Sequence, residues 1–373
     1  MIVFGTRPEA IKILPVYELL KSCSRFAVEV FFTGQSPDLA QTRFGLRSID
    51  IDHRMEVNRG ESLTSFFGRV LSETGDILSS SRFEYVLVQG DTSSAFAGAL
   101  AGFARKVDVV HLEAGLRTSD LLRPFPEEGF RQCISRLTSY HFCPTEVSAN
   151  NLAVEKVGGV IEVTGNTVID AIHGWMADKH LVPIKDLAHL FSPDSECKEP
   201  TSLSDGFVLV TAHRRESIDS GIANICEAIN RLAQAHPEVV FVFVKHKNPE
   251  VTKIVDQVLK DQANVVAIEP LDYELFLKLL SECLFAISDS GGIQEEVTAL
   301  GKLLLVTREV TERPEGLATG HLRLTGLSSD VIFHEADRLL SCGLPSLPSE
   351  SPYGDGRAAR RIVERLTCAI NSA

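Results

Sequence analysis

The regular alternation of short apolar runs with helical patterns constrains this fold more than any other feature of the chain. The runs are rich in Val, Ile and Phe, which is typical of strands buried on both faces of a parallel sheet. In the first half they lie at residues 2–4, 28–32, 85–89, 108–113, 139–143 and 160–163. In the second half they lie at residues 207–212, 239–245, 264–269, 284–288 and 303–306. The pattern therefore predicts an α/β fold with two parallel sheets and crossover helices.

The length of 373 residues exceeds what one hydrophobic core usually serves. A weakly patterned stretch that ends near Gly206 separates the two series of runs. We predict an N-terminal Rossmann-like domain over 1–168, a C-terminal one over 169–355, and a last helix at about 356–373 that packs back on the first domain. Two doubly wound domains in series place their strand carboxyl ends around a shared cleft, so the chemistry is expected in the loops there.

The acidic composition limits the classes of partner. A net charge of −13 and a pI near 5.4 disfavour general binding to nucleic acid or to an anionic membrane surface. The sequence has no long apolar run and no signal-peptide pattern at its start, so we expect a cytoplasmic protein. The eight cysteines are scattered without a CxxC pair, which favours buried thiols over a metal or disulfide framework.

The segment FGTRPEAIK, residues 4–12, places two cations at a helix start. Pro8 suits the first helical turn and Glu9 complements the helix dipole, so we predict that a helix begins at Arg7 or Pro8. Arg7 and Lys12 add positive charge to an end that already carries unpaired N–H groups. A bound phosphate explains these cations. The alternative is that Arg7 pairs with Glu9 or with a neighbouring loop.

The segment SDSGGIQEE follows a predicted strand of the second domain and indicates a diphosphate cradle. Gly291 and Gly292 allow backbone N–H groups to approach an anion closely, and Ser290 adds a hydroxyl. A carboxylate beside a diphosphate is costly unless it accepts hydrogen bonds from neutral hydroxyls, so Glu296 points to a ribose diol. Arg313, in TERPEG, is a natural phosphate clamp.

Acidic side chains follow predicted strands of the first domain. Asp91 and Glu113 lie at strand ends, and the motif FPEE supplies Glu127 and Glu128. Such residues favour acid–base work or contacts with sugar hydroxyls. The alternatives are that Asp91 caps the next helix and that Glu128 lies on a solvated face. His213, in TAHRRES, holds the corresponding position of the second domain.

Two further histidines and the spacing of the possible metal ligands give no sign of additional site chemistry. His111 and His141 lie within strand-like runs and are interpreted as core histidines with satisfied ring nitrogens. The spacing of the carboxylates and His213 matches no metal motif. Two helix starts and several cations could neutralise a diphosphate without a metal.

Ten motifs, in order from residue 2 to about 366, strongly resemble the bacterial non-hydrolysing UDP-N-acetylglucosamine 2-epimerases. They are FGTRPEAIK, GDTSS, HLEAGLRT, FPEE, VTGNTVIDA, TAHRRES, HKNP, DSGGIQEE, TERPE and PYGDG. The resemblance implies the glycosyltransferase-B arrangement of two Rossmann-like domains, a homodimer, and no added metal or nicotinamide cofactor. It implies that UDP-N-acetylglucosamine and UDP-N-acetylmannosamine are interconverted.

The resemblance also implies roles for individual residues. The UDP-binding residues would be Arg7, Lys12, Phe276 near the uracil, Ser290, Gly291, Gly292, Glu296 and Arg313. The catalytic residues would be Asp91, Glu113, Glu127 and His213. In this family UDP leaves C1 as a base removes the C2 proton, which gives 2-acetamidoglucal, and UDP then re-adds after protonation from the other face. Two faces need two proton-transfer groups, and the sequence leaves their assignment open.

The chain departs from the family pattern where some relatives bind a second UDP-N-acetylglucosamine as an activator. Many members read TGQHR, whereas this chain reads TGQSPDL, so Ser36 replaces a histidine. Gln35, Arg69 and His246 would remain as a remnant of the activator site. Leu271 stands where some relatives have a polar residue near the base.

Other functions stay open at this stage. A glycosyltransferase on the same fold would use the same UDP cradle but would need an acceptor site. A hydrolysing epimerase would release UDP and N-acetylmannosamine, although GLRT, HRRE and ERPE fit the non-hydrolysing branch better. A branch acting on diacetamido uronic acid nucleotides tends to carry GARPQ instead of GTRPEA. A UDP-sugar sensor that binds without turnover would not need the catalytic candidates Asp91, Glu113, Glu127 and His213.

Overall fold

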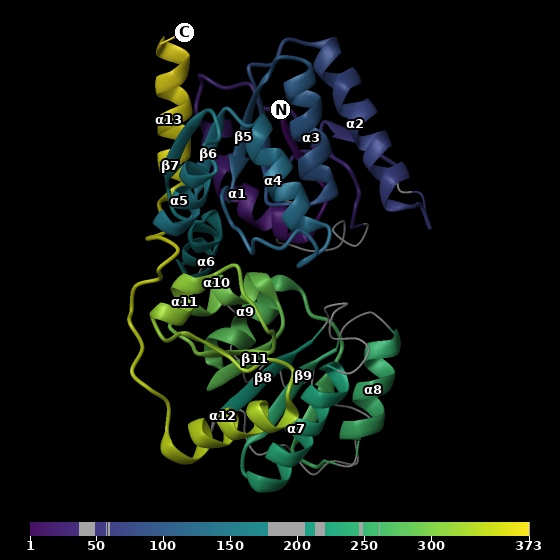
Figure 1. Ribbon diagram of the computed structural model, residues 1–373, viewed down its shortest axis with the longest axis vertical. Helices are drawn as coiled ribbons and strands as arrows, with labels where there is room; N and C mark the ends of the chain where they lie inside the picture. The colour runs from purple at the N-terminus through teal and green to yellow at the C-terminus, as the bar shows by residue number, and fades with distance from the viewer. Residues whose placement is uncertain are drawn as a thin grey trace. The chain divides into compact units, whose positions relative to one another are not determined.

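The computed structural model describes residues 1–36, 49–56, 58, 60–177, 206–212, 221–245, 249–260 and 262–372. The chain divides into two compact units (Figure 1). The first comprises Met1–Gly174 and Tyr353–Ala373, and the second comprises Trp175–Pro352. Each unit is described by itself.

The sheet of the first unit has seven parallel strands in the order β3-β2-β1-β4-β5-β6-β7. The strands are β1 (Ile2–Phe4), β2 (Val30–Phe32), β3 (His53–Arg54), β4 (Tyr85–Gln89), β5 (Asp108–Leu112), β6 (Tyr140–Cys143) and β7 (Val160–Val163). The helices are α1 (Arg7–Ser22), α2 (Leu63–Ser80), α3 (Ser93–Ala104), α4 (Glu127–Leu137), α5 (Glu146–Val154), α6 (Thr167–Ala177) and α13 (Ala358–Ser372). The strand order reverses direction between β1 and β4, which makes their carboxyl ends the topological switch point.

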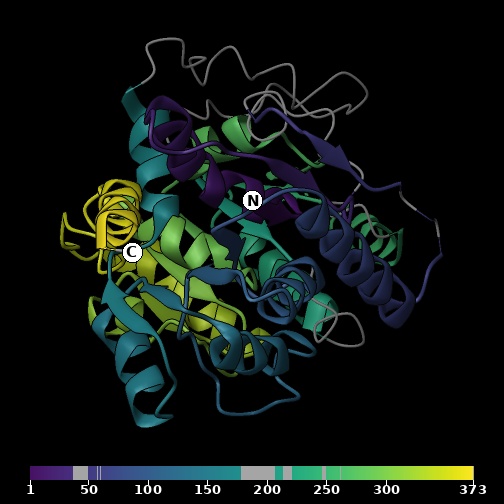
Figure 2. The same cartoon turned by 90° about the horizontal axis from the view of Figure 1, so that it is seen from above.

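Helices cover both faces of this sheet (Figure 1, Figure 2). Successive side chains of a strand point to opposite faces, so Ile2 and Phe4 pack with α1 and α13, whereas Val3 packs with α2 and α3. The carboxylate of Asp170 on α6 accepts hydrogen bonds from the backbone N–H groups of Ala358 and Ala359 and so caps α13. These contacts hold the last helix in the first unit.

The sheet of the second unit has six parallel strands in the order β10-β9-β8-β11-β12-β13. The strands are β8 (Phe207–Thr211), β9 (Val240–Val244), β10 (Val265–Ile268), β11 (Phe285–Ser288), β12 (Leu304–Val306) and β13 (Leu322–Leu324). The helices are α7 (Gly221–Ala235), α8 (Pro249–Leu259), α9 (Tyr273–Glu282), α10 (Gly291–Ala299), α11 (Pro314–Ala318) and α12 (Ser329–Cys342). Here the switch point lies between β8 and β11.

The predicted strands are confirmed to within two residues at each end, and two further strands were missed. β3 and β13 are edge strands of two and three residues, too short to show a period.

The expectation of buried thiols is right for Cys143, Cys226 and Cys283. It is wrong for Cys133, Cys342 and Cys368, which are exposed on helices. Within the described part of the chain, none of the helices combines the length and apolar character of a membrane span.

Candidate active site

The candidate residues of the first unit gather at its topological switch point. Arg7 and Lys12 lie in the first turns of α1, which follows β1. Asp91 lies two residues after β4, Glu113 comes directly after the neighbouring strand β5, and Glu127 begins α4. The carboxyl ends of parallel strands meet at one edge of a sheet, so these side chains share one edge.

Lys12 and Glu113 form a buried ion pair. The Lys12 Nζ lies 2.5 Å from Glu113 Oε2, and the two side chains are 8% and 6% exposed. The Gln89 side-chain amide donates to the same carboxylate oxygen. Glu113 has a φ of 63°, a left-handed conformation that costs a non-glycine residue about 1–2 kcal/mol. The ion pair and the backbone together fix the direction of this carboxylate.

Asp91 is held by a cation that sequence reasoning missed. Arg131 on α4 contacts Asp91 Oδ2 through Nε at 2.7 Å and Nη2 at 2.6 Å. The Arg131 Nη1 donates to the fully buried Glu128 at 3.1 Å. The side chain of Asp91 remains 24% exposed, so its carboxylate keeps access to solvent.

This arrangement corrects two alternatives left open by the sequence. The N-cap of α3 is Thr92, whose hydroxyl accepts from the Ala95 N–H, so Asp91 is not the helix cap. Glu128 does not lie on a solvated face, since it accepts hydrogen bonds from the Thr118 N–H and from Arg131. The Glu128–Arg131 spacing of three residues was the available signal, because such residues meet on one helix face.

Glu9 forms hydrogen bonds that link the start of α1 to Thr92, the residue after Asp91. Its carboxylate accepts from the N–H groups of Gly5 and Thr6, from the Thr6 hydroxyl at 2.7 Å and from the Thr92 hydroxyl at 2.6 Å. A side chain at Gly5 would place Cβ 2.1 Å from the Thr33 hydroxyl oxygen, so this turn requires glycine. Burial raises the pKa of Glu9 to about 7, against the lowering effect of these hydrogen bonds.

The raised pKa of Glu9 predicts a pH-dependent stability. A carboxyl group whose pKa is higher in the folded state stabilises the fold fully below its unfolded pKa, and this contribution is lost as the pH rises through about 7. We expect the difference in unfolding free energy between the wild type and Glu9→Gln to fall by about 3 kcal/mol from pH 4.5 to pH 8. Urea unfolding of both proteins at several pH values measures it. A difference that does not vary with pH would contradict the prediction.

Glu127 is partly exposed but has one buried carboxyl oxygen, and the two strand histidines are buried. The Oε2 of Glu127 has no hydrogen-bond partner among the described residues, which leaves it available to a ligand. His111 and His141 are core residues, as predicted, and their Nε2 atoms bond to the carbonyl oxygens of Gly90 and Gly158. Their Nδ1 atoms lack a partner in the described parts of the chain, so the expectation of satisfied ring nitrogens holds for one nitrogen of each ring.

Two residues of the predicted activator remnant have local partners. The side-chain oxygen of Gln35 accepts from the N–H and hydroxyl of Ser94 at the start of α3. Arg69 on α2 is paired with Glu61 at 2.7 Å. His246 and the predicted catalytic His213 lie outside the described residues.

The candidate residues of the second unit gather at its own switch point. Ser290 is the N-cap of α10, which follows β11, and Gly291 and Gly292 form its first turn. Glu296 lies on the next turn, and its Oε1 accepts from the Tyr273 hydroxyl at 2.9 Å. Phe276 lies on α9, the same helix as Tyr273.

Arg313 lies in a buried network of four charges. Its Nε donates to Glu295 at 2.9 Å and its Nη1 to Glu312 at 2.5 Å, and Arg308 donates to Glu312 at 3.1 Å. Each of the four side chains is at most 6% exposed. Two arginines and two glutamates balance in charge, which offsets the cost of burying them.

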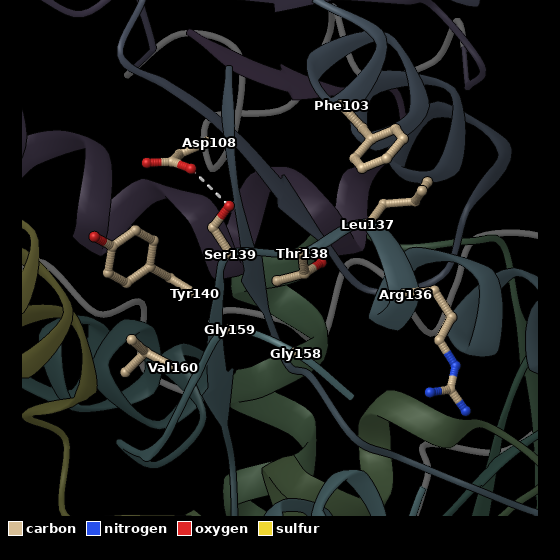
Figure 3. Close-up of a pocket in the computed structure, with 10 residues that line it drawn as sticks. All are labelled: Phe103, Asp108, Arg136, Leu137, Thr138, Ser139, Tyr140, Gly158, Gly159 and Val160. Atoms are coloured by element: carbon tan, nitrogen blue, oxygen red, sulfur yellow. Dashed lines mark hydrogen bonds between the residues drawn. The ribbon is translucent and has the colours of Figure 1, made fainter. Parts of the chain in front are cut away.

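A pocket of about 330 Å³ lies at the opposite edge of the first sheet. Figure 3 shows the residues that line it. Asp108, Tyr140 and Val160 line it at the amino ends of β5, β6 and β7. The Ser139 hydroxyl donates to Asp108 at 2.7 Å across it. It contains none of the predicted site residues, which follow strand carboxyl ends. In the described part of the chain, no group of three or more His, Cys, Asp or Glu side chains could hold a metal ion.

Two parallel α/β units, each with charged or hydroxyl side chains at its switch point, define a two-domain Rossmann-like protein with candidate anion-binding and acid–base groups. The family model described as UDP-N-acetylglucosamine 2-epimerase matches residues 18–367. The chain belongs to this family.

Individual relatives match over almost the whole chain. A UDP-N-acetylglucosamine 2-epimerase of Yersinia pestis is 39% identical over 369 residues, covering 98% of this chain and 97% of the relative. A crystal structure of the UDP-GlcNAc 2-epimerase from Neisseria meningitidis bound to UDP-GlcNAc is 38% identical, with a TM-score of 0.88 and 98% of both chains covered. The Methanocaldococcus jannaschii UDP-GlcNAc 2-epimerase, solved with UDP-GlcNAc and UDP, is 28% identical, with a TM-score of 0.82 and 98% of both chains covered.

Proposed function

We propose that this protein interconverts UDP-N-acetylglucosamine and UDP-N-acetylmannosamine by elimination and re-addition of UDP through 2-acetamidoglucal. The observation that carries the proposal is the pair of carboxylates, Asp91 and Glu113, at the ends of neighbouring strands, each contacting a cation. Full-length similarity to proteins named for this activity supports it.

The first unit supplies the carboxylates and the second unit supplies His213 as the candidate proton-transfer groups in this proposal. A carboxylate or His213 removes the C2 proton while the C1–O bond breaks and its electron pair leaves with UDP. A second group protonates C2 of the glucal from the other face, and UDP re-adds at C1. Asp91, Glu113 and Glu127 are the candidate acids, and Glu127 presents a buried carboxyl oxygen that could meet a sugar hydroxyl or a proton.

The second unit binds the nucleotide in this proposal. Ser290, Gly291 and Gly292 offer a hydroxyl and N–H groups to the diphosphate, and Glu296 accepts from the ribose hydroxyls. Arg313, which is bonded to Glu295 and Glu312, donates to the diphosphate, and Phe276 packs near the uracil. No step requires an added metal or redox cofactor.

Arg7 and Lys12 stabilise the leaving diphosphate, and Lys12 has a second effect. In the structure Lys12 is bonded to Glu113, and this contact stabilises the ionised carboxylate. A diphosphate that draws Lys12 toward itself therefore makes Glu113 a stronger base. Substrate binding and base activation are linked through this lysine.

Proton NMR of the protein with UDP-N-acetylglucosamine in deuterated water tests the function. We expect deuterium at C2 together with a UDP-N-acetylmannosamine signal, unchanged by a chelator. Because Ser36 replaces the histidine of the activator segment, we expect a hyperbolic dependence of the rate on substrate.

The other outcomes of this experiment identify the competing functions. Free N-acetylmannosamine would indicate a hydrolysing epimerase. Tight binding without C2 exchange would indicate a UDP-sugar sensor or a glycosyltransferase. A sigmoidal rate curve would show that the activator site survives. Cytoplasmic location and a homodimer remain part of the proposal, and light scattering of the purified protein tests the dimer.

A further inference from the structure

The hydroxyl of Tyr273 fixes one oxygen of the Glu296 carboxylate. The distance from Tyr273 Oη to Glu296 Oε1 is 2.9 Å, and the residues are 4% and 7% exposed. They lie 23 positions apart, on α9 and α10, so the bond joins two separate helices of the second unit. A tyrosine hydroxyl donates to a carboxylate in a charge-assisted hydrogen bond, which is stronger than a neutral one.

The position of this carboxylate matters because it lies beside the glycine turn. A Cβ built on Gly292 would lie 3.9 Å from Glu296 Oε1, which places that oxygen over the first turn of α10. The N–H groups at a helix start attract any nearby anion, a side-chain carboxylate included. A glutamate free to change rotamer could therefore turn toward the N–H groups that the diphosphate needs.

We propose that Tyr273 is a positioning residue that sets the selectivity of the nucleotide site for ribose. By holding Oε1, it fixes the Glu296 carboxylate in one orientation, directed at the ribose hydroxyls, and prevents it from rotating further toward the N–H groups of the α10 turn. This inference rests on the proposed function, in which Glu296 accepts from the ribose. It adds a residue that does not itself contact the ligand.

The test compares UDP with 2′,3′-dideoxy-UDP by isothermal titration calorimetry. Hydrogen bonds to a charged group contribute about 1.5–3 kcal/mol, so the wild type is expected to bind UDP at least about tenfold more tightly than the dideoxy analogue. In Tyr273→Phe this ratio is expected to fall at least about threefold, with most of the change in UDP affinity. Its KM for UDP-N-acetylglucosamine is expected to rise by a larger factor than its kcat falls.

Control variants separate positioning from folding. Glu296→Gln should lose the ribose preference, and Tyr140→Phe, at the amino end of β6 in the other unit, should retain it. A Tyr273→Phe variant that keeps the full ratio, or that weakens both ligands equally, would overturn the proposal. A wild type that binds both ligands equally would also overturn it, whereas one that binds neither would refute the proposed function itself.

Discussion

Replacing Asp91 with Asn is expected to lower kcat for epimerisation by about 10²–10⁴-fold, the usual contribution of a general acid or base. The amide keeps an oxygen that can accept from Arg131, so the side chain stays in place while the titratable group is lost. The partly exposed carboxylate is suited to exchanging protons, which an amide cannot do.

The same variant assigns Asp91 to one face of C2. Formation of 2-acetamidoglucal would be followed separately from UDP-N-acetylglucosamine and from UDP-N-acetylmannosamine. If Asp91 is the base for one epimer, Asp91→Asn slows elimination from that epimer much more than from the other. Asp108→Asn, at the amino end of β5, is the matched control and should leave the rate unchanged. Near-normal turnover of Asp91→Asn from both epimers would remove Asp91 from the mechanism.

Replacing Arg131 with Met is expected to lower the free energy of unfolding by about 3–5 kcal/mol, as is typical when one partner of a buried ion pair is removed. The guanidinium is the cation between Asp91 and the fully buried Glu128. Without it, the Glu128 carboxylate loses its bonded cation while it remains in a site of low dielectric constant, and Asp91 loses its orientation.

The double variant Glu128→Gln with Arg131→Met distinguishes charge from packing. It removes the buried negative charge together with its partner, so we expect it to recover at least half of the stability lost by the single variant. Urea unfolding followed by circular dichroism measures both. If the double variant is as unstable as Arg131→Met alone, the loss comes from packing of the arginine and not from the unpaired charge. We expect low kcat in both variants, because both lose the contact that orients Asp91.

The central strands of both sheets can be predicted from sequence, because a strand that is buried on both faces is a nearly continuous run of apolar residues. Strands such as 85–89 and 240–244 are nearly continuous apolar runs, and each was predicted from its own residues. The edge strands β3 and β13 were missed because they are short and carry polar residues such as His53 and Arg323. These two strands are defined by their hydrogen-bonded pairing with β2 and β12, which depends on the tertiary structure and not on the local sequence.

The candidate site divides in the same way. Glycine turns, cations at helix starts and acids after strands are local signals, and they placed Arg7, Ser290 and Asp91 at strand carboxyl ends. The contacts of Asp91 with Arg131 and of Glu296 with Tyr273 join residues 40 and 23 positions apart, and no local pattern predicts such pairs. The bond of Glu9, in the TRPE motif, to Thr92 joins residues 83 positions apart, and no local pattern predicts it either.

The sequence by itself determined the class of fold and the family, because apolar periodicity and ordered motifs are properties of adjacent residues. Only the tertiary structure decided which group each charged side chain contacts. Parallel strands bring distant loops to one edge of a sheet, and hydrogen-bond distances there select the partners. The choice of Thr92 over Asp91 as helix cap, and the burial of Glu128, were decided at that level.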